Sequence, residues 1–193
     1  MFDIYFSTFF AAWLNCRAGS GRPDFFCAFA ADFAVRPRSV RRFFADYPDG
    51  RLVSVVRDPA GWLASAMAKQ TTSRIFSARE KAMRHWRRSC RALQANKASR
   101  LDKVDIMIFS DIIEATVATM RSLCRSLGIA FDEAVTVPTF NGDPIESNSS
   151  FEASKGFINA QVLARKSPDE SAPDDRELFA QLNRKSTRLN SSH

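Results

Sequence analysis

The sequence predicts an α/β domain of three layers, in which helices flank a parallel sheet. Two apolar segments, Arg51 to Val56 and Val104 to Phe109, read as strands and are each followed at once by a helix start. A long amphipathic segment, Ser77 to Ala98, lies between them, and crossover helices of this kind join parallel neighbours. The chain has 193 residues, of which 45% are hydrophobic, enough for one domain with its own core.

The N-terminal part of the chain predicts two helices and a short strand. Bulky apolar residues recur at helical spacing from Ile4 to Leu14, and this run is too short to span a bilayer. Phe25 to Phe33 is aromatic and apolar without helical periodicity, so we expect a short buried strand. Ser39 is a suitable N-cap for a helix that ends at Tyr47, before the turn signal Pro48-Asp49-Gly50.

The remainder predicts the strand, turn and helix unit twice. The first strand is rich in β-branched residues, as in a buried parallel strand, and Asp58 then caps a helix that begins at Pro59. After the second strand, Asp111 would cap a helix that ends at Leu127, with Gly128 as a left-handed C-cap. The segment Val135 to Phe151 is rich in Pro, Asn, Gly and Ser, so we expect a loop.

Composition restricts the class of partner only weakly. The formal net charge of +7 suits an anionic partner, but it does not distinguish nucleic acid, membrane surface and phosphorylated cofactor. The four cysteines, Cys16, Cys27, Cys90 and Cys124, form no C-x-x-C pair, so we expect reduced thiols, a cytoplasmic protein and no metal.

One position combines several features of an anion site. Parallel α/β sheets bind ligands beyond the carboxyl ends of their strands, and Arg57 directly follows the strand that ends at Val56. The helix that begins at Pro59 would direct its free N–H groups and its positive dipole end toward the same place. Arg57 adds a charged planar fork for phosphate oxygens, and Ser65 lies two helical turns further on.

Arg57, Asp58-Pro59 and Ser65 together resemble the 3′-phosphate-binding motif of sulfotransferases that use 3′-phosphoadenosine 5′-phosphosulfate (PAPS). The segments FFADYPDGRLVSVVRDPAGWLASA and PTFNGDPIESNSSFEASKG are similar to a bacterial branch of that family. The resemblance implies a P-loop-like fold, PAPS as sulfuryl donor, and Arg57 and Ser65 as ligands of its 3′-phosphate. It also implies that Lys155-Gly156 closes over this phosphate and that Phe140 stacks on adenine. A plain surface loop and a buried anchoring phenylalanine remain the alternatives.

The resemblance also implies that part of the family's domain is missing. The glycine- and lysine-bearing loop that holds the 5′-phosphosulfate has no match, so we expect residues 1–176 to be an N-terminally incomplete sulfotransferase domain, inactive as a fragment. No catalytic base is assigned, and we expect His85 to be solvent-exposed. Residues 177–193 are expected to be a disordered or artefactual tail, because residues 184–193, RKSTRLNSSH, resemble a translated sequencing adaptor.

Two other functions compete with sulfuryl transfer to a hydroxyl or amine acceptor. A nucleic-acid-binding protein would use the basic helix Arg79 to Arg100, but no aromatic stacking platform accompanies its arginines, so we expect no nucleic acid. A non-catalytic nucleotide-binding protein is the other alternative. Small-molecule, lipid and carbohydrate acceptors and the oligomeric state all stay open, because acceptor pockets are built from variable loops.

Overall fold

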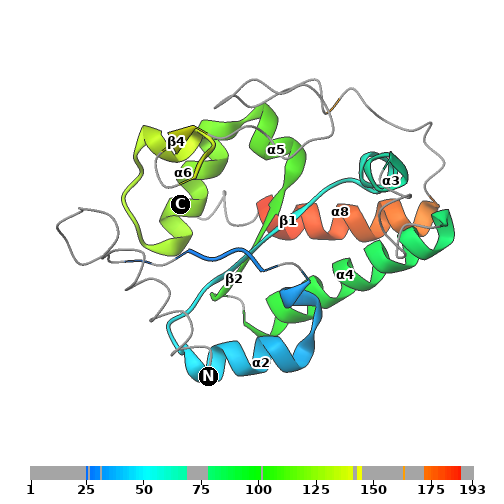
Figure 1. Cartoon of the computed structure of the whole chain (residues 1–193), viewed down its shortest axis with the longest axis horizontal. Coiled ribbons are helices and arrows are strands. Elements are labelled where there is room, and N and C mark those ends of the chain that lie inside the picture. The colour runs from blue at the N-terminus through cyan, green and yellow to red at the C-terminus, as the bar shows by residue number, and fades with distance from the viewer. Residues whose placement is uncertain are drawn as a thin grey trace. The chain divides into compact units, whose positions relative to one another are not determined.

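The computed structural model describes residues 25, 27–30, 32–68, 78–100, 102–140, 143–144, 163 and 172–187 (Figure 1). The chain divides into two compact units, Met1–Gly50 and Arg51–His193, and each is described by itself. The predicted helix from Ile4 to Leu14 lies outside the described residues.

The first unit contains a 3₁₀ turn, η1 (Phe33–Val35), and the helix α2 (Pro37–Asp46). The helix starts two residues before the predicted cap Ser39, with Arg36 at the N-cap and Pro37 in the first turn, where its fixed φ suits a helix. The predicted strand Phe25 to Phe33 is wrong for its described residues. Instead of pairing with another strand, Phe33 packs edge-on against Phe43, with ring centroids 5.9 Å apart.

The second unit is built on two parallel strands, β1 (Leu52–Val56) and β2 (Val104–Ile108), paired in register from Leu52 with Val104 to Val56 with Ile108. The crossover between them contains α3 (Pro59–Ala68) and α4 (Arg79–Ser99). This confirms the predicted α/β fold with a parallel sheet. A second, antiparallel pair consists of the two-residue strands β3 (Thr139–Phe140) and β4 (Asp143–Pro144).

The two parallel strands differ in burial. Every residue of β2 is buried, as is typical of a parallel strand covered on both faces. In β1, Val53 and Val55 are 42% and 54% exposed, so the prediction of a buried strand is wrong on that face. Successive side chains point to opposite faces of a strand, and the face with these two valines is not fully covered.

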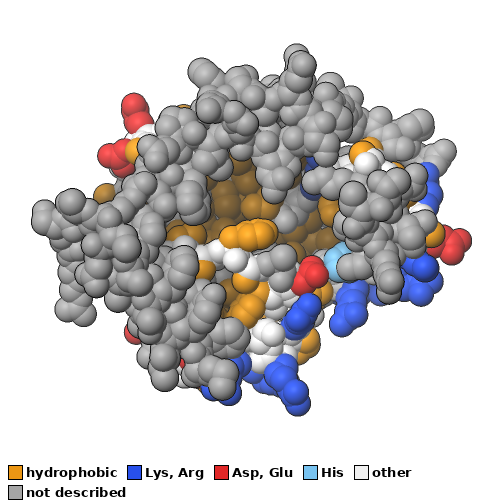
Figure 2. Space-filling view, in the orientation of Figure 1, with side chains coloured by type: hydrophobic (Ala, Val, Ile, Leu, Met, Phe, Trp, Pro, Cys, Tyr) orange, Lys and Arg blue, Asp and Glu red, His pale blue; other side chains and the backbone are white. Residues whose placement is uncertain are grey.

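The helix α4 packs on the sheet through one apolar face and turns another to solvent. Its buried positions recur every three or four residues. Figure 2 shows several Lys and Arg side chains along the edge of the molecule where α4 lies. At its C-terminal end, the buried Lys97 Nζ lies 4.0 Å from Asp105 Oδ1 of β2, and burial lowers the pKa of Lys97 despite this carboxylate. The buried positions of α4 are Ala82, Met83, Trp86, Cys90, Leu93 and Lys97.

After β2 the chain forms two helices where one was predicted. They are α5 (Phe109–Glu114) and α6 (Thr116–Leu127), and the backbone leaves the helical region at Ala115, with φ −133° and ψ 46°. Asp111 therefore lies inside α5 and is not an N-cap. Gly128 is confirmed as a left-handed C-cap at φ 72°, and it is followed by the 3₁₀ turn η2 (Glu133–Thr136).

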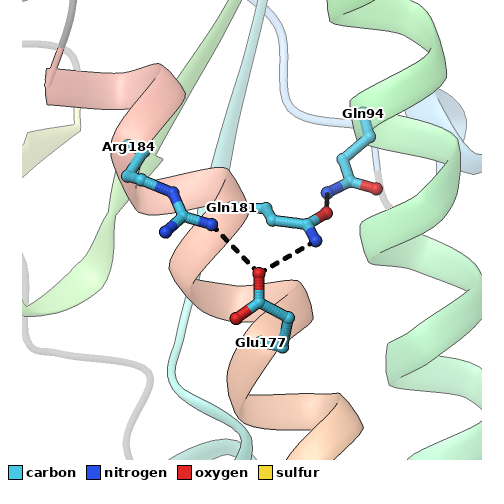
Figure 3. Close-up of polar contacts among 4 residues, drawn as sticks. All are labelled: Gln94, Glu177, Gln181 and Arg184. Carbon is cyan, nitrogen blue, oxygen red and sulfur yellow. Dashed lines mark hydrogen bonds and ion pairs between the residues drawn. The ribbon is translucent and has the colours of Figure 1, made fainter.

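The last described helix, α8 (Pro173–Thr187), packs along α4. Residues 177–187, which the sequence analysis expects to belong to a disordered or artefactual tail, are helical in this structure, and the expected domain boundary at residue 176 falls inside α8. Leu182 is fully buried, and Gln94 donates a hydrogen bond of 3.1 Å to Gln181 (Figure 3). The composition of the tail favours disorder in isolation, but this packing against α4 orders it. Residues 188–193 lie outside the described part.

An ion pair joins the two helices near the start of α8. Arg87 of α4 makes two hydrogen bonds to Asp175, with Nε 2.5 Å from Oδ1 and a terminal nitrogen 2.7 Å from Oδ2. Asp175 is 1% exposed, so water cannot solvate its negative charge and the ion pair with Arg87 stabilises the carboxylate instead.

The buried cysteine of α4 is expected to resist alkylation. Burial, with the nearby Asp175 as a second cause, raises the pKa of the Cys90 thiol to about 12, whereas Cys27 is exposed. Since only the thiolate reacts, iodoacetamide at pH 8 should label Cys27 in the native protein and Cys90 only after denaturation. Peptide mass spectrometry measures both sites. Equal labelling rates in the native state would contradict the buried position of Cys90.

Among the helices that the structure describes, none is long and apolar enough to cross a membrane. The residues that the structure describes contain no cluster of three or more His, Cys, Asp and Glu side chains that could hold a metal ion.

Candidate functional site

Arg57 lies where the sequence places it, in the turn between the carboxyl end of β1 and the start of α3. Asp58 is the N-cap of α3, as predicted: its Oδ1 accepts a hydrogen bond of 2.7 Å from the Gly61 N–H. The expected anion site on the free N–H groups of this helix needs a correction. Pro59 has no N–H and Gly61 already donates to Asp58, so the end of the helix is partly occupied by the protein's own carboxylate.

Gly61 is a site residue that the sequence analysis missed. A Cβ atom at this position would lie 2.6 Å from Asp58 Oδ2 and 2.8 Å from Arg57 Nε. The Arg57 side chain therefore lies directly against the α3 backbone, at a distance that only glycine permits. A glycine in the first turn of a helix, where it lowers helix propensity, was the available signal.

Two aromatic residues from other elements hold Arg57. Its guanidinium carbon lies 4.9 Å from the centre of the Phe109 ring, at the carboxyl end of β2, as in a cation–π contact. The buried Trp86 of α4 donates its indole N–H to the Arg57 carbonyl at 3.2 Å. Burial lowers the pKa of Arg57 and the nearby Asp58 carboxylate opposes this, but an arginine keeps its charge at neutral pH.

The structure brings Ser65 to the same face of α3 as Arg57. Ser65 is half-buried and lies one helical turn after Gly61, so the two residues share a face of the helix. Helical side chains lean toward the N-terminus, which directs the Ser65 side chain over the turn that contains Gly61. Since Arg57 Nε lies against Gly61, both predicted phosphate ligands line one flank of the first two turns of α3.

The structure describes the other predicted site residues only in part. Lys155 and Gly156 lie outside the described residues, and so do the nearby serines of the same loop. Phe140 is in β3, but its side chain is outside the described part. His85 is half-buried, contrary to the expected solvent exposure, because its ring stacks on Trp62 of α3, with centroids 6.4 Å apart and planes at 19°.

Two comparisons with known proteins bear on the family and the fold. A model of the sulfotransferase family matches residues 7–133, which is more than half of the chain. Among solved structures, the chain is similar to the sulfotransferase domain from the curacin biosynthetic pathway, with a TM-score of 0.58 and 12% sequence identity. The similarity covers 80% of this chain and 60% of that domain, and at this identity it shows a shared fold. A search of curated proteins gave no match. The matched residues include both parallel strands and the turn that contains Arg57. The chain therefore belongs to the sulfotransferase family.

Proposed function

We propose that this chain carries the 3′-phosphate-binding part of an enzyme that transfers a sulfuryl group from PAPS to a hydroxyl or amine acceptor, and that Arg57 and Ser65 hold the 3′-phosphate of the donor. The observation that carries the proposal is the shared flank of α3, where Arg57 Nε lies against Gly61 and Ser65 follows one turn later. PAPS supplies the activated sulfuryl group. The flank of α3 would bind the 3′-phosphate of the same nucleotide, whereas the sulfuryl group is attached to the 5′-phosphate.

The residues at this flank fit a phosphate. Arg57 carries a permanent charge and can form two parallel hydrogen bonds to phosphate oxygens, and Ser65 offers a hydroxyl donor. The Asp58 carboxylate caps the end of α3 and lies beside Arg57 Nε at Gly61, so a phosphate on this flank would bind Arg57 next to a negative charge that opposes it. The Phe109 ring contacts Arg57 and limits its rotamers, which lowers the entropy lost on binding.

The family resemblance extends the proposal to residues beyond this flank. Lys155-Gly156 would close over the 3′-phosphate and Phe140 would stack on adenine. The acceptor would be a small molecule, a lipid or a carbohydrate, and the protein would act in the bacterial cytoplasm without a metal ion.

Calorimetry with two nucleotides tests the proposal. 3′-Phosphoadenosine 5′-phosphate carries the 3′-phosphate, whereas 5′-AMP lacks only this group. We expect the first nucleotide to bind the full chain at least about tenfold more tightly, as one charge-assisted pair requires. Equal affinities for both nucleotides would mean that Arg57 and Ser65 do not read a 3′-phosphate.

Gly61→Ala is expected to reduce 3′-phosphate binding with little change in stability. The added methyl group would displace the Arg57 side chain and the Asp58 cap, and the lost cap costs about 1 kcal/mol. The gain in helix propensity from glycine to alanine is also about 1 kcal/mol, so the two effects nearly cancel. Urea unfolding measures the stability and calorimetry measures the affinity. A variant that binds 3′-phosphoadenosine 5′-phosphate as tightly as the wild type would show that the close contact of Arg57 with α3 is unnecessary.

A further inference from the structure

Trp86 reaches the Arg57 turn from a different element, the crossover helix α4. Its indole Nε1–H donates a hydrogen bond of 3.2 Å to the backbone carbonyl of Arg57, 29 residues earlier in the chain. Trp86 is 3% exposed and lies on the buried face of α4. An indole has one N–H donor and no acceptor, and a buried N–H needs a partner. This bond therefore ties the Arg57 backbone to the core of the second unit.

The hydrogen bond restrains the backbone on both sides of one peptide unit. Arg57 is the first residue after the paired part of β1, whose register with β2 ends at Val56. A peptide unit is planar, so a bond to its carbonyl also orients the N–H at its other end, which belongs to Asp58. The bond thus restrains ψ of Arg57 and φ of Asp58, the residue that caps α3. One contact from α4 therefore restrains the direction in which the Arg57 side chain leaves the turn.

The residues on either side of Trp86 hold this part of α4 in place. His85 stacks on Trp62 of α3, with ring centroids 6.4 Å apart, and Arg87 makes two hydrogen bonds to Asp175 of α8. Consecutive residues of α4 thus contact α3, the turn after β1, and α8. A donor on a helix that is held from two sides keeps its position when a ligand binds, as a pre-organised site requires.

We propose that Trp86 is a positioning residue for 3′-phosphate recognition. It acts on the Arg57 backbone, whereas Phe109 and Gly61 confine the Arg57 side chain. A guanidinium group that extends from a fixed backbone loses less freedom when it binds a phosphate. Loss of the indole N–H should therefore weaken the interaction with the 3′-phosphate and not with the rest of the nucleotide. This inference rests on the proposed function, because it concerns the same Arg57 site.

Trp86→Phe tests the proposal, because phenylalanine keeps an aromatic ring at this position and removes the N–H donor. Calorimetry of the wild type and the variant with 3′-phosphoadenosine 5′-phosphate and with 5′-AMP gives the ratio of the two affinities for each protein. We expect this ratio to fall about three- to tenfold in Trp86→Phe, as for the loss of one neutral hydrogen bond. A tryptophan that only filled the core would lower the urea midpoint on substitution and leave the ratio unchanged.

Leu93→Val is the matched control. Leu93 is buried on the same face of α4, two helical turns after Trp86, so its substitution loosens the same packing away from Arg57. This variant should be less stable than the wild type and keep the wild-type ratio. A ratio that stayed unchanged in Trp86→Phe, or that fell equally in both variants, would overturn the proposal. Equal affinities for both nucleotides in the wild type itself would overturn the proposed function, and this inference with it.

A second readout follows the indole in the wild type, so it does not depend on how stable the variant is. After residue-specific assignment, the Trp86 indole signal is monitored in a proton–nitrogen correlation spectrum. Saturating 3′-phosphoadenosine 5′-phosphate should shift this signal, because the ligand restrains the residue whose carbonyl accepts the bond, and 5′-AMP should leave it in place. A Trp86 signal that moved with neither nucleotide, in a wild type that prefers the first, would overturn the proposal.

Discussion

Arg57→Ala is expected to weaken the binding of 3′-phosphoadenosine 5′-phosphate by about 10- to 100-fold, the loss of a charge-assisted hydrogen-bond pair worth about 1.5–3 kcal/mol. The affinity for 5′-AMP should stay unchanged, because that nucleotide has no 3′-phosphate for Arg57 to bind. Isothermal titration calorimetry of the wild type and of Arg57→Ala with both nucleotides measures these affinities. The informative quantity is the ratio of a protein's affinities for the two nucleotides. A general loss of structure would weaken both affinities and leave this ratio unchanged.

Two further variants show how Arg57 acts. Arg57→Lys keeps the charge but loses the planar fork and its contact with Phe109, so it should recover only part of the affinity. Ser65→Ala removes one neutral hydroxyl and should cost about 0.5–1.5 kcal/mol. If Arg57→Ala weakened both nucleotides equally, Arg57 would support the fold of the turn and not the recognition of phosphate.

Arg87→Met is expected to lower the free energy of unfolding by about 3 kcal/mol, since it leaves a buried carboxylate without its partner. Asp175 is 1% exposed and accepts both hydrogen bonds from Arg87, whereas the Arg87 side chain is 38% exposed. Removing the arginine is therefore worse than removing the acid, because Arg87 can be solvated and Asp175 cannot. Urea unfolding followed by circular dichroism measures this difference.

The same pair provides its own control. Asp175→Leu should cost less than Arg87→Met, and the double variant Arg87→Met with Asp175→Leu should recover part of the lost stability by replacing two charges with apolar contacts. Gln94→Ala removes an exposed hydrogen bond between the same two helices and should cost about 1 kcal/mol or less. An Arg87→Met variant as stable as the Gln94→Ala variant would show that Asp175 is compensated by other groups.

The parts of the fold that the sequence predicts correctly are those with local causes. Asp58 and Pro59 determine the start of α3 through a side-chain cap and a fixed φ, and Gly128 ends α6 through its left-handed backbone. Both signals act within a few residues, so they are visible in the sequence.

The parts that the sequence does not predict depend on distant contacts. The order in residues 177–187 comes from α4, about 90 residues earlier in the chain, and the exposure of Val55 depends on which elements cover the sheet. The candidate site divides in the same way. Arg57 and Ser65 form a recognisable spacing, whereas the roles of Gly61, Phe109 and Trp86 follow from the approach of three separate elements.

The register of β1 with β2 also bears on how the protein folds. Each paired residue of β1 meets a residue about 50 positions later, so the pair forms only after a long chain segment closes, at an entropic cost that local helices do not have. The indole of Trp86 reaches the Arg57 carbonyl from within that segment. Recognition of a nucleotide at Arg57 is therefore a property of the fully folded unit, and a bound nucleotide would raise its melting temperature by mass action.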